Sequence, residues 1–299
     1  MLKENSSLSM IKRELRRDKI ALISLIFLVV LVAFLIISSF FIDEYAVLNP
    51  PFTSRYLWRT NLPPSLTFLL GTDDRGRNGV FTLIIATRQT LTIAATATIL
   101  SSVLGIIYGL LSGYLGGRVD RFMNGFVDMI TVIPNLIMIV ILIGFFGGFT
   151  ARNFVLTLSL LAWTSVAKVV RARVIQEKNL DYVVASKTLG SQHFKIIFKK
   201  ILPNINTVVT ASVILNAVTI IIAEAALAFF SFRETPLVSF SDTNPTLGTL
   251  LSTTVFSHIL RFRWWRWTPA ATMIVLIIFS ISMIGNMLNK AANAGERGD

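Results

Sequence analysis

The residues that could form an enzyme site are few, and they are scattered along the chain. His193 and His258 are the only two histidines, and they lie in segments that we expect on opposite sides of a membrane. They therefore cannot form a paired metal site or a proton relay within the chain. Asp73 and Asp74 lie in the stretch GTDDRGR, which lacks the remaining alternating oxygen ligands of a calcium-binding loop. We therefore expect no metal site in this chain.

A phosphate-binding loop is also excluded by the residues that the chain has at the deciding positions. Gly71 and Gly76 have the required spacing, but Arg77 and Asn78 stand where such a loop needs Lys and then Ser or Thr. The chain has no cysteine, so a thiolate nucleophile or a disulfide is excluded as well. The sequence predicts no catalytic residues and no ATP hydrolysis by this chain alone.

Two acidic residues, Asp128 and Glu224, lie inside long apolar segments. A charge in such a segment costs about 2.5–3.5 kcal/mol or more, so it usually marks an ion pathway or a bound partner. Each acid lies less than two turns from the end of its segment, which favours anchoring near the interface or hydrogen bonding between helices. The alternative is an ion-coupled carrier, in which one of the two would titrate during transport.

The composition is that of a membrane protein. Hydrophobic residues make up 54% of the chain and charged residues 15%, and the mean hydropathy is +0.69. A helix needs about 20 apolar residues to cross the bilayer. Six segments meet or approach that length, at 20–42, 90–113, 122–145, 153–170, 207–230 and 269–289. The fold class is therefore an all-α polytopic membrane protein with about six transmembrane helices.

The basic residues indicate the orientation of these helices. The net charge of +12 comes from residues between apolar runs, which argues against nucleic acid and for a lipid bilayer as partner. Cytoplasmic N and C termini would place every lysine and most of the 28 basic residues inside. The expected parts are a cytoplasmic tail (1–19), a first transmembrane helix (20–42), an external loop (43–89) and a transmembrane permease domain (90–299). The permease domain contains a cytoplasmic loop (171–206) and a second external loop (231–268).

The second external loop contains the run RFRWWRW, from Arg261 to Trp267. Tryptophan and arginine at the end of a span commonly anchor it at the headgroup level. A stacking or cation-π surface for a docked partner or a passing substrate is the alternative interpretation. The sequence leaves both open.

The cytoplasmic loop contains two short amphipathic stretches separated by Gly190. Tyr182, Ala185 and Leu189 have the spacing of one helix face, and Gly190 then interrupts the helix. The second stretch, with apolar positions at Phe194, Ile197, Phe198 and Ile201, is predicted to end at Leu202 and Pro203. Such a basic amphipathic element either lies on anionic lipid or docks on another protein.

The same stretch resembles the EAA loop of the permease subunits of ABC importers. That loop has the form E-A-A, three residues, G, then about a dozen residues to L-P. Ala185, Gly190, Leu202 and Pro203 match it at this spacing, whereas Val184 replaces the Glu and Ser186 the second Ala. In the family, the short helix, here with Tyr182, Val184, Ala185, Ser186, Leu189 and Gly190, fits a groove on the ATP-binding subunit.

Other segments are similar to motifs of the C-type permeases of dipeptide and oligopeptide importers. These are LGTDDRGRNGVF from Leu70, YLGGRVD from Tyr114, VDMITVIP from Val127 and EAALAFF from Glu224. Residues 244–251 stand where that group often has P-x-W-G, with Leu247 in the place of the Trp.

The resemblance implies a type I ABC importer permease in the bacterial cytoplasmic (inner) membrane that passes short peptides into the cytoplasm. Its implied partners are a second, related permease, two cytoplasmic ATP-binding subunits and an extracytoplasmic peptide-binding protein. ATP and magnesium would be bound by those subunits, and this chain would hold no cofactor. Import of a nickel chelate or glutathione by the same machinery, an ion-coupled carrier and a non-transporting scaffold are the alternatives.

Overall fold

The computed structural model describes residues 13–49, 59–148, 150–230, 245–255 and 263–296, and it is helical apart from the connecting segments. The helices are α2 (Lys19–Ser39), α3 (Glu44–Leu48), α5 (Gly79–Leu115), α6 (Gly117–Val132), α7 (Asn135–Phe145), α8 (Ala151–Glu177), α9 (Asp181–Thr188), α10 (His193–Ile196), the π-helix η1 (Ile197–Ile201), α11 (Leu202–Asn204), α12 (Asn206–Phe230), α14 (Leu247–Val255) and α16 (Trp264–Glu296).

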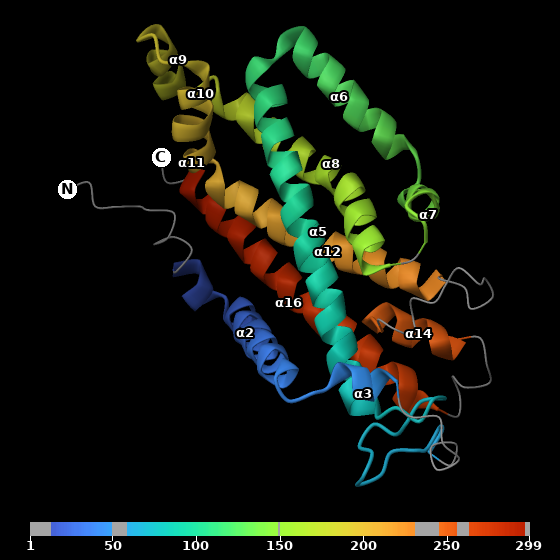
Figure 1. Cartoon of the computed structure of the whole chain (residues 1–299). Helices are drawn as coiled ribbons and strands as arrows, with labels where there is room; N and C mark the ends of the chain where they lie inside the picture. Colours follow the sequence, from blue (N-terminus) through green and yellow to red (C-terminus); the bar gives the residue numbers. More distant parts are fainter. Residues whose placement is uncertain (1–12, 50–58, 149, 231–244, 256–262, 297–299) are drawn as a thin grey trace.

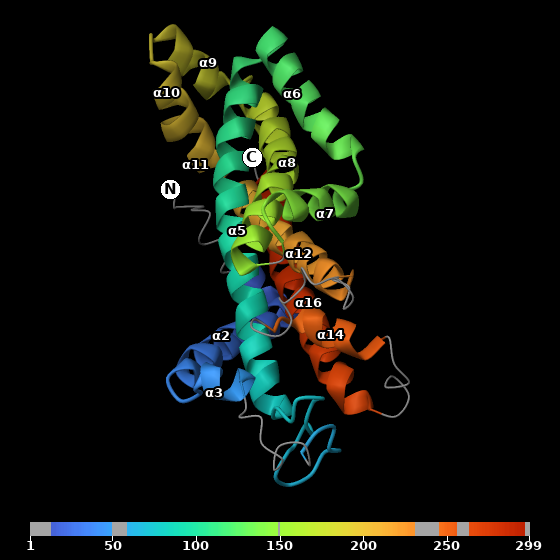
Figure 2. The ribbon, with the colours of Figure 1, turned by 45° about the vertical axis from the view of Figure 1, so that its right-hand side comes forward.

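The bundle is built around α5, with α8, α12 and α16 packed along it (Figure 1). Helix α2 lies against α16, and α6 and α7 lie on the other side. Helices α9, α10 and α11 form one end of the molecule, which we call the α9 end (Figure 2). The segment 59–78, α3 and α14 lie at the opposite end, which we call the loop end. Lys290 near the end of α16 forms an ion pair with Asp18, the residue before α2 (3.4 Å), which joins the start of α2 to the last turns of α16.

The predicted membrane helices are confirmed in number, whereas three of them are longer than expected. Five helices are long and apolar enough to cross a membrane, or six if α6 and α7 together count as one span. Helix α5 already begins at Gly79, because Asn78 caps it by accepting a hydrogen bond from the Val80 N–H (3.0 Å). Residues 79–89, assigned from the sequence to the external loop, are therefore part of this helix.

The prediction of a continuous helix over 122–145 is wrong. Helices α6 and α7 meet at a bend of 89° between Val132 and Asn135. Pro134 has no N–H to continue the helical hydrogen bonds, and it drives Ile133 into an extended conformation (φ −77°, ψ 130°). Most apolar side chains of this bent pair face outward, including Phe122, Met129 and Phe145, which are 80%, 62% and 81% exposed.

The closest helix packing in the bundle is between α5 and α8, and three glycines at intervals of four residues make it possible. A Cβ on Gly105 would lie 2.6 Å from the Trp163 carbonyl oxygen, and one on Gly109 would lie 2.7 Å from the Ala167 oxygen. At Gly113 the Cβ of Val174 would be only 2.8 Å away. Small residues at this spacing let two backbones approach closely, and dispersion along the whole contact then stabilises the pair.

We expect Gly109→Ala to destabilise the protein by about 1–3 kcal/mol, because the added methyl group must push α8 away. Gly125→Ala on α6 is the matched control, because the space beside that glycine is open. Alanine there should be neutral or stabilising by up to about 1 kcal/mol through helix propensity. Reversible unfolding in mixed micelles measures both free energies, and equal values for the two variants would contradict the packing.

Candidate functional site

The α9 end contains the short helix and glycine interruption that the sequence predicts. Helix α9 runs from Asp181 to Thr188, and Gly190 follows with a φ of +79°. Its N–H donates to the Lys187 carbonyl (3.1 Å), which closes the end of the helix. Nothing lies within 4 Å of the place where a Cβ on Gly190 would be. The turn is therefore exposed and adopts a conformation that favours glycine.

The face of α9 that the sequence singled out points away from the bundle. Val183 and Ser186 are the buried positions, and Val183 packs with Val170 and Val174 at the end of α8. Of the positions that resemble the EAA loop, Val184, Ala185, Leu189 and Gly190 are exposed, Tyr182 is 39% exposed, and Ser186 is buried. Leu189 is 85% exposed and Val184 48%. Helix α9 thus presents an apolar outer surface while its inner face is fixed to the bundle.

The predicted apolar face of the second amphipathic stretch, with Phe194, Ile197, Phe198 and Ile201, is wrong in part. Ile197 and Ile201 are buried as expected, but Phe194 is 68% exposed, and the other fully buried positions are Ile196 and Ile205. The π-helix η1 follows Ile196, so the spacing of a regular α-helix does not hold through this stretch.

The helix also does not end at Leu202 and Pro203. Pro203 lies in the first turn of α11, where a missing N–H costs little, and the Ile205 N–H donates to the Ile201 carbonyl (3.1 Å). The helical path therefore runs on from α10 almost to the start of α12.

A buried carboxylate that the sequence reasoning missed connects α8, α9 and α11. Glu177 is 3% exposed, and its Oε1 accepts hydrogen bonds from the Tyr182 hydroxyl (2.6 Å) and from Nδ2 of Asn204. Burial and the hydrogen bond to Glu177 raise the pKa of Tyr182, so the hydroxyl keeps its proton and remains a donor. Of these three residues, only Tyr182 lies in the helix that resembles the EAA loop. No pattern in the sequence predicts that Glu177 and Asn204 are in contact.

A second polar group connects the same end to α5 and α6. The Asp120 carboxylate at the start of α6 accepts from Nε and Nη2 of Arg171 on α8 (2.5 and 2.8 Å) and from the Ser112 hydroxyl on α5 (2.6 Å). Tyr114 on α5 hydrogen-bonds His193 on α10 (2.8 Å). Asp120 is part of the YLGGRVD motif, but its partner 51 residues away could not be read from the sequence. The helix ends beneath α9 are therefore joined to one another.

The two acids inside apolar segments both contact other helices. Asp128 on α6 forms an ion pair with Lys168 on α8 (2.9 Å) and accepts from Asn124 (2.7 Å). Its side chain is 52% exposed. Glu224 on α12 is fully buried, and Thr90 on α5 lies 3.4 Å from its Oε2. Thr90 also accepts from the Leu247 N–H at the start of α14 (3.0 Å), so Glu224 lies where three helices meet.

The comparisons with known proteins agree with this architecture. The family model described as binding-protein-dependent transport system inner membrane component matches residues 101–295, and that of the N-terminal TM domain of oligopeptide transport permease C matches residues 6–64.

Among its relatives are oligopeptide transport system permease protein OppC of Lactococcus lactis subsp. cremoris, 33% identical over 97% of each chain, and dipeptide transport system permease protein DppC of Escherichia coli K12, 32% identical over 92% of this chain and 89% of the relative. DppC of Bacillus subtilis is 30% identical over 93% of this chain and 83% of the relative.

The family match over residues 101–295 identifies this bundle of apolar helices as a membrane permease. The chain belongs to the family of inner membrane components of binding-protein-dependent transport systems, and it is homologous to the C-type permeases of oligopeptide and dipeptide ABC transporters. It is accordingly a multi-pass protein of the cell membrane.

We expect Tyr182→Phe to loosen α9 locally. The change removes one donor from a buried carboxylate, which costs about 1–3 kcal/mol, so amides of 181–190 should open about 5- to 150-fold more often. Hydrogen exchange followed by mass spectrometry in nanodiscs measures this opening. The control is Tyr45→Phe, whose side chain is 78% exposed and far from the α9 end. Unchanged exchange in the Tyr182 variant would show that the hydrogen bond does not hold α9 in place.

Proposed function

We propose that this chain is a permease subunit of an ATP-driven importer that passes short peptides into the cytoplasm, and that α9 is its docking element for an ATP-binding subunit. The observation that carries the proposal is the two-sided construction of α9. Its outer face is apolar and exposed at Val184 and Leu189, whereas its inner face is packed on α8 at Val183. An exposed apolar face at the end of a membrane bundle favours a protein partner.

The orientation follows from this assignment. An ATP-binding subunit is cytoplasmic, so the α9 end would face the cytoplasm together with the N and C termini, and the loop end would face outward. Lys187, Lys195, Lys199 and Lys200 then lie on the cytoplasmic side, in agreement with the positive-inside tendency.

The same geometry provides a route for movement. When the ATP-binding subunits close on ATP, they would displace α9 and α10 together. Glu177 connects α9 to α8, and the pair Tyr114–His193 connects α10 to α5. Because α5 and α8 are packed backbone to backbone, they would tilt as one body, and the path would alternate between outward-open and inward-open states. The chain would form part of the translocation path and transmit movement from α9 to α5 and α8, and its partners would hydrolyse ATP.

The partner set follows from the proposed class of importer. A second, related permease would complete the path, because one bundle of five or six helices does not enclose a peptide-sized channel. Two ATP-binding subunits would hold ATP and magnesium, and an extracytoplasmic binding protein would deliver the substrate. Short peptides are proposed because the relatives named above are oligopeptide and dipeptide permeases. The alternative substrates are a nickel chelate and glutathione, which the same assembly of subunits would import.

Purification of the tagged chain from its native membrane tests the assembly directly. Mass spectrometry should find a related permease and ATP-binding subunits, and the complex in nanodiscs should hydrolyse ATP faster when a peptide-loaded binding protein is added. Recovery of the intact chain alone would contradict the proposal and favour an ion-coupled carrier that depends on Asp128 or Glu224.

We expect Gly190→Trp to leave the protein inserted but to abolish peptide uptake while ATP hydrolysis continues. A bulky side chain at this exposed turn would keep α9 out of a groove on the ATP-binding subunit. Gly117→Trp is the matched control, because Gly117 also has a positive φ (+59°) and open space beside it. Peptide uptake into proteoliposomes, measured beside ATP hydrolysis, compares the two. Normal uptake by the Gly190 variant, or equal loss in both variants, would contradict docking at α9.

A further inference from the structure

A pocket lies within the membrane-spanning part of the bundle, where α7 packs against α8 and α12 (Figure 2). Its volume is about 150 Å³. A cavity of about that size holds a benzene ring. Its floor is apolar, because Ile139, Leu158 and Ile220 line it and each is at most 2% exposed. Ala162 on α8 and Ala223 on α12 also line it, and these short side chains leave the space open.

The mouth of the pocket is polar. Asn135, Ser165 and Thr219, one from each of the three helices, line the pocket and are exposed. The Ser165 hydroxyl lies 3.0 Å from Oδ1 of Asn216 on α12, and the amide of Asn216 donates to Ser101 on α5 (3.0 Å). These contacts hold α5, α8 and α12 together at the mouth. An apolar floor with a few fixed polar groups is typical of a site for a small organic molecule.

An ion pair on the same side of α8 indicates what covers the pocket. Lys168 lies three residues after Ser165, on the same face of the helix, and it pairs with Asp128 on α6 (2.9 Å). The two side chains remain 42% and 52% exposed. Charges that face hydrocarbon are costly, and a protein that covered the pair permanently would remove its hydration. We therefore expect this face of α8 to border water inside the membrane, as the wall of a transport path does.

A peptide combines the groups that such a site can bind. Its backbone N–H groups can donate to the hydroxyl and amide oxygens at the mouth, and one apolar side chain can enter the floor. The acyl chain of a lipid would fill the floor but would leave the mouth without hydrogen-bond partners. The volume suits a single side chain as large as that of leucine or phenylalanine.

We propose that this pocket receives one apolar side chain of the peptide that passes through the importer, while Asn135, Ser165 and Thr219 hydrogen-bond its backbone. The assignment rests on the proposed function, which supplies the path and the peptide. The permease would then select among peptides by itself. A peptide with a leucine or phenylalanine side chain would be held in the path more tightly than one of glycine and alanine.

Photo-crosslinking in the unaltered protein tests the site directly. The complete importer is reconstituted in proteoliposomes, and a tripeptide that carries a diazirine analogue of leucine is supplied through the binding protein and irradiated during ATP-driven uptake. Mass spectrometry should find adducts of this chain at 135–139 of α7, 158–165 of α8 and 219–223 of α12. Uptake without adducts there, or adducts confined to lipid or to the second permease, would overturn the proposal.

Ala162→Leu fills the pocket from its wall. The change should lower the adduct yield about 4- to 12-fold, which corresponds to losing half of the burial of a leucine or phenylalanine side chain. Ala172→Leu is the matched control, because Ala172 is exposed on the same helix and does not line the pocket. Both variants are compared at equal amounts of assembled importer, judged by recovery of the second permease. Equal adduct yields would overturn the proposal.

The chain has no cysteine, so a single cysteine introduced at the pocket reports on what covers it. In the assembled importer, Ala162→Cys should react with a charged, water-soluble maleimide, and a leucine-rich peptide should protect it. Ala167→Cys is the control that should not react, since Ala167 is 2% exposed on the same helix. If the cysteine at 162 reacts only after the complex is dissociated, the second permease or lipid covers the pocket, and the proposal is overturned.

The proposed function fails in a different way from the pocket. If the unaltered importer takes up no peptide when ATP and the binding protein are present, the importer assignment is wrong, and the pocket assignment falls with it. If uptake is normal but the adducts lie elsewhere, only the pocket assignment is wrong.

Discussion

The close approach of α5 and α8 is the constraint on which the rest of the structure depends. Gly105, Gly109 and Gly113 bring α5 directly onto the backbone of α8, where any larger side chain would meet a carbonyl oxygen or a valine. Apolar side chains gain little by leaving lipid for a protein interior, so close packing is the main source of helix association in a membrane. The other helices of the bundle pack around this pair.

The polar contacts at the α9 end depend on the same pair. Arg171 on α8 reaches Asp120 only because the ends of α5, α6 and α8 lie side by side, and Glu177 reaches Tyr182 and Asn204 from the last turn of α8. Polar groups that are buried, such as Glu177, need hydrogen-bond partners within the protein. Helix α9 is thus supported from beneath while its outer face stays exposed. A docking element that transmits force needs both properties.

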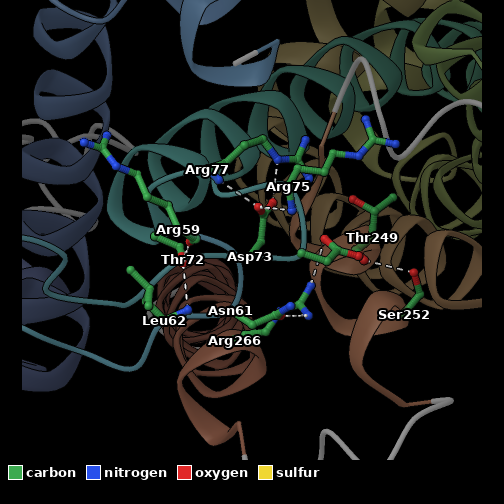
Figure 3. Close-up of polar contacts among 11 residues, drawn as sticks. Arg59, Asn61, Leu62, Thr72, Asp73, Arg75, Arg77, Thr249, Ser252 and Arg266 are labelled. Atoms are coloured by element: carbon green, nitrogen blue, oxygen red, sulfur yellow. Dashed lines mark hydrogen bonds and ion pairs between the residues drawn. The ribbon is translucent and has the colours of Figure 1, made fainter. Parts of the chain in front are cut away.

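Acidic side chains hold separate elements together at both ends of the molecule. At the α9 end, Asp120 and Glu177 each accept hydrogen bonds from several donors. At the loop end, Asp73 accepts from the backbone N–H groups of Arg75 and Arg77 and from Nε of Arg77 (Figure 3). A network whose members are satisfied in this way fixes the local shape.

The sequence alone determined the class of the protein and most of its helices. The long apolar runs can only be helices in a membrane, because each backbone group must be paired within its own segment there. The order of short motifs, including Ala185, Gly190, Leu202 and Pro203, also indicated the family correctly, because the family constrains those spacings. Residues 50–58 of the first external loop, residues 231–244, His258 and the first part of the Arg261–Trp267 run lie outside the described residues.

Only the tertiary structure decided which residues meet. The bend at Pro134 and the π-turn at Ile197–Ile201 changed which side chains face inward, since a helical periodicity read from sequence assumes an uninterrupted helix. Glu177 with Asn204 and Asp120 with Arg171 are separated by 27 and 51 residues along the chain, and no local pattern connects them. Their meeting follows from how closely the helices pack and at what angle, and these depend on all the side chains between them.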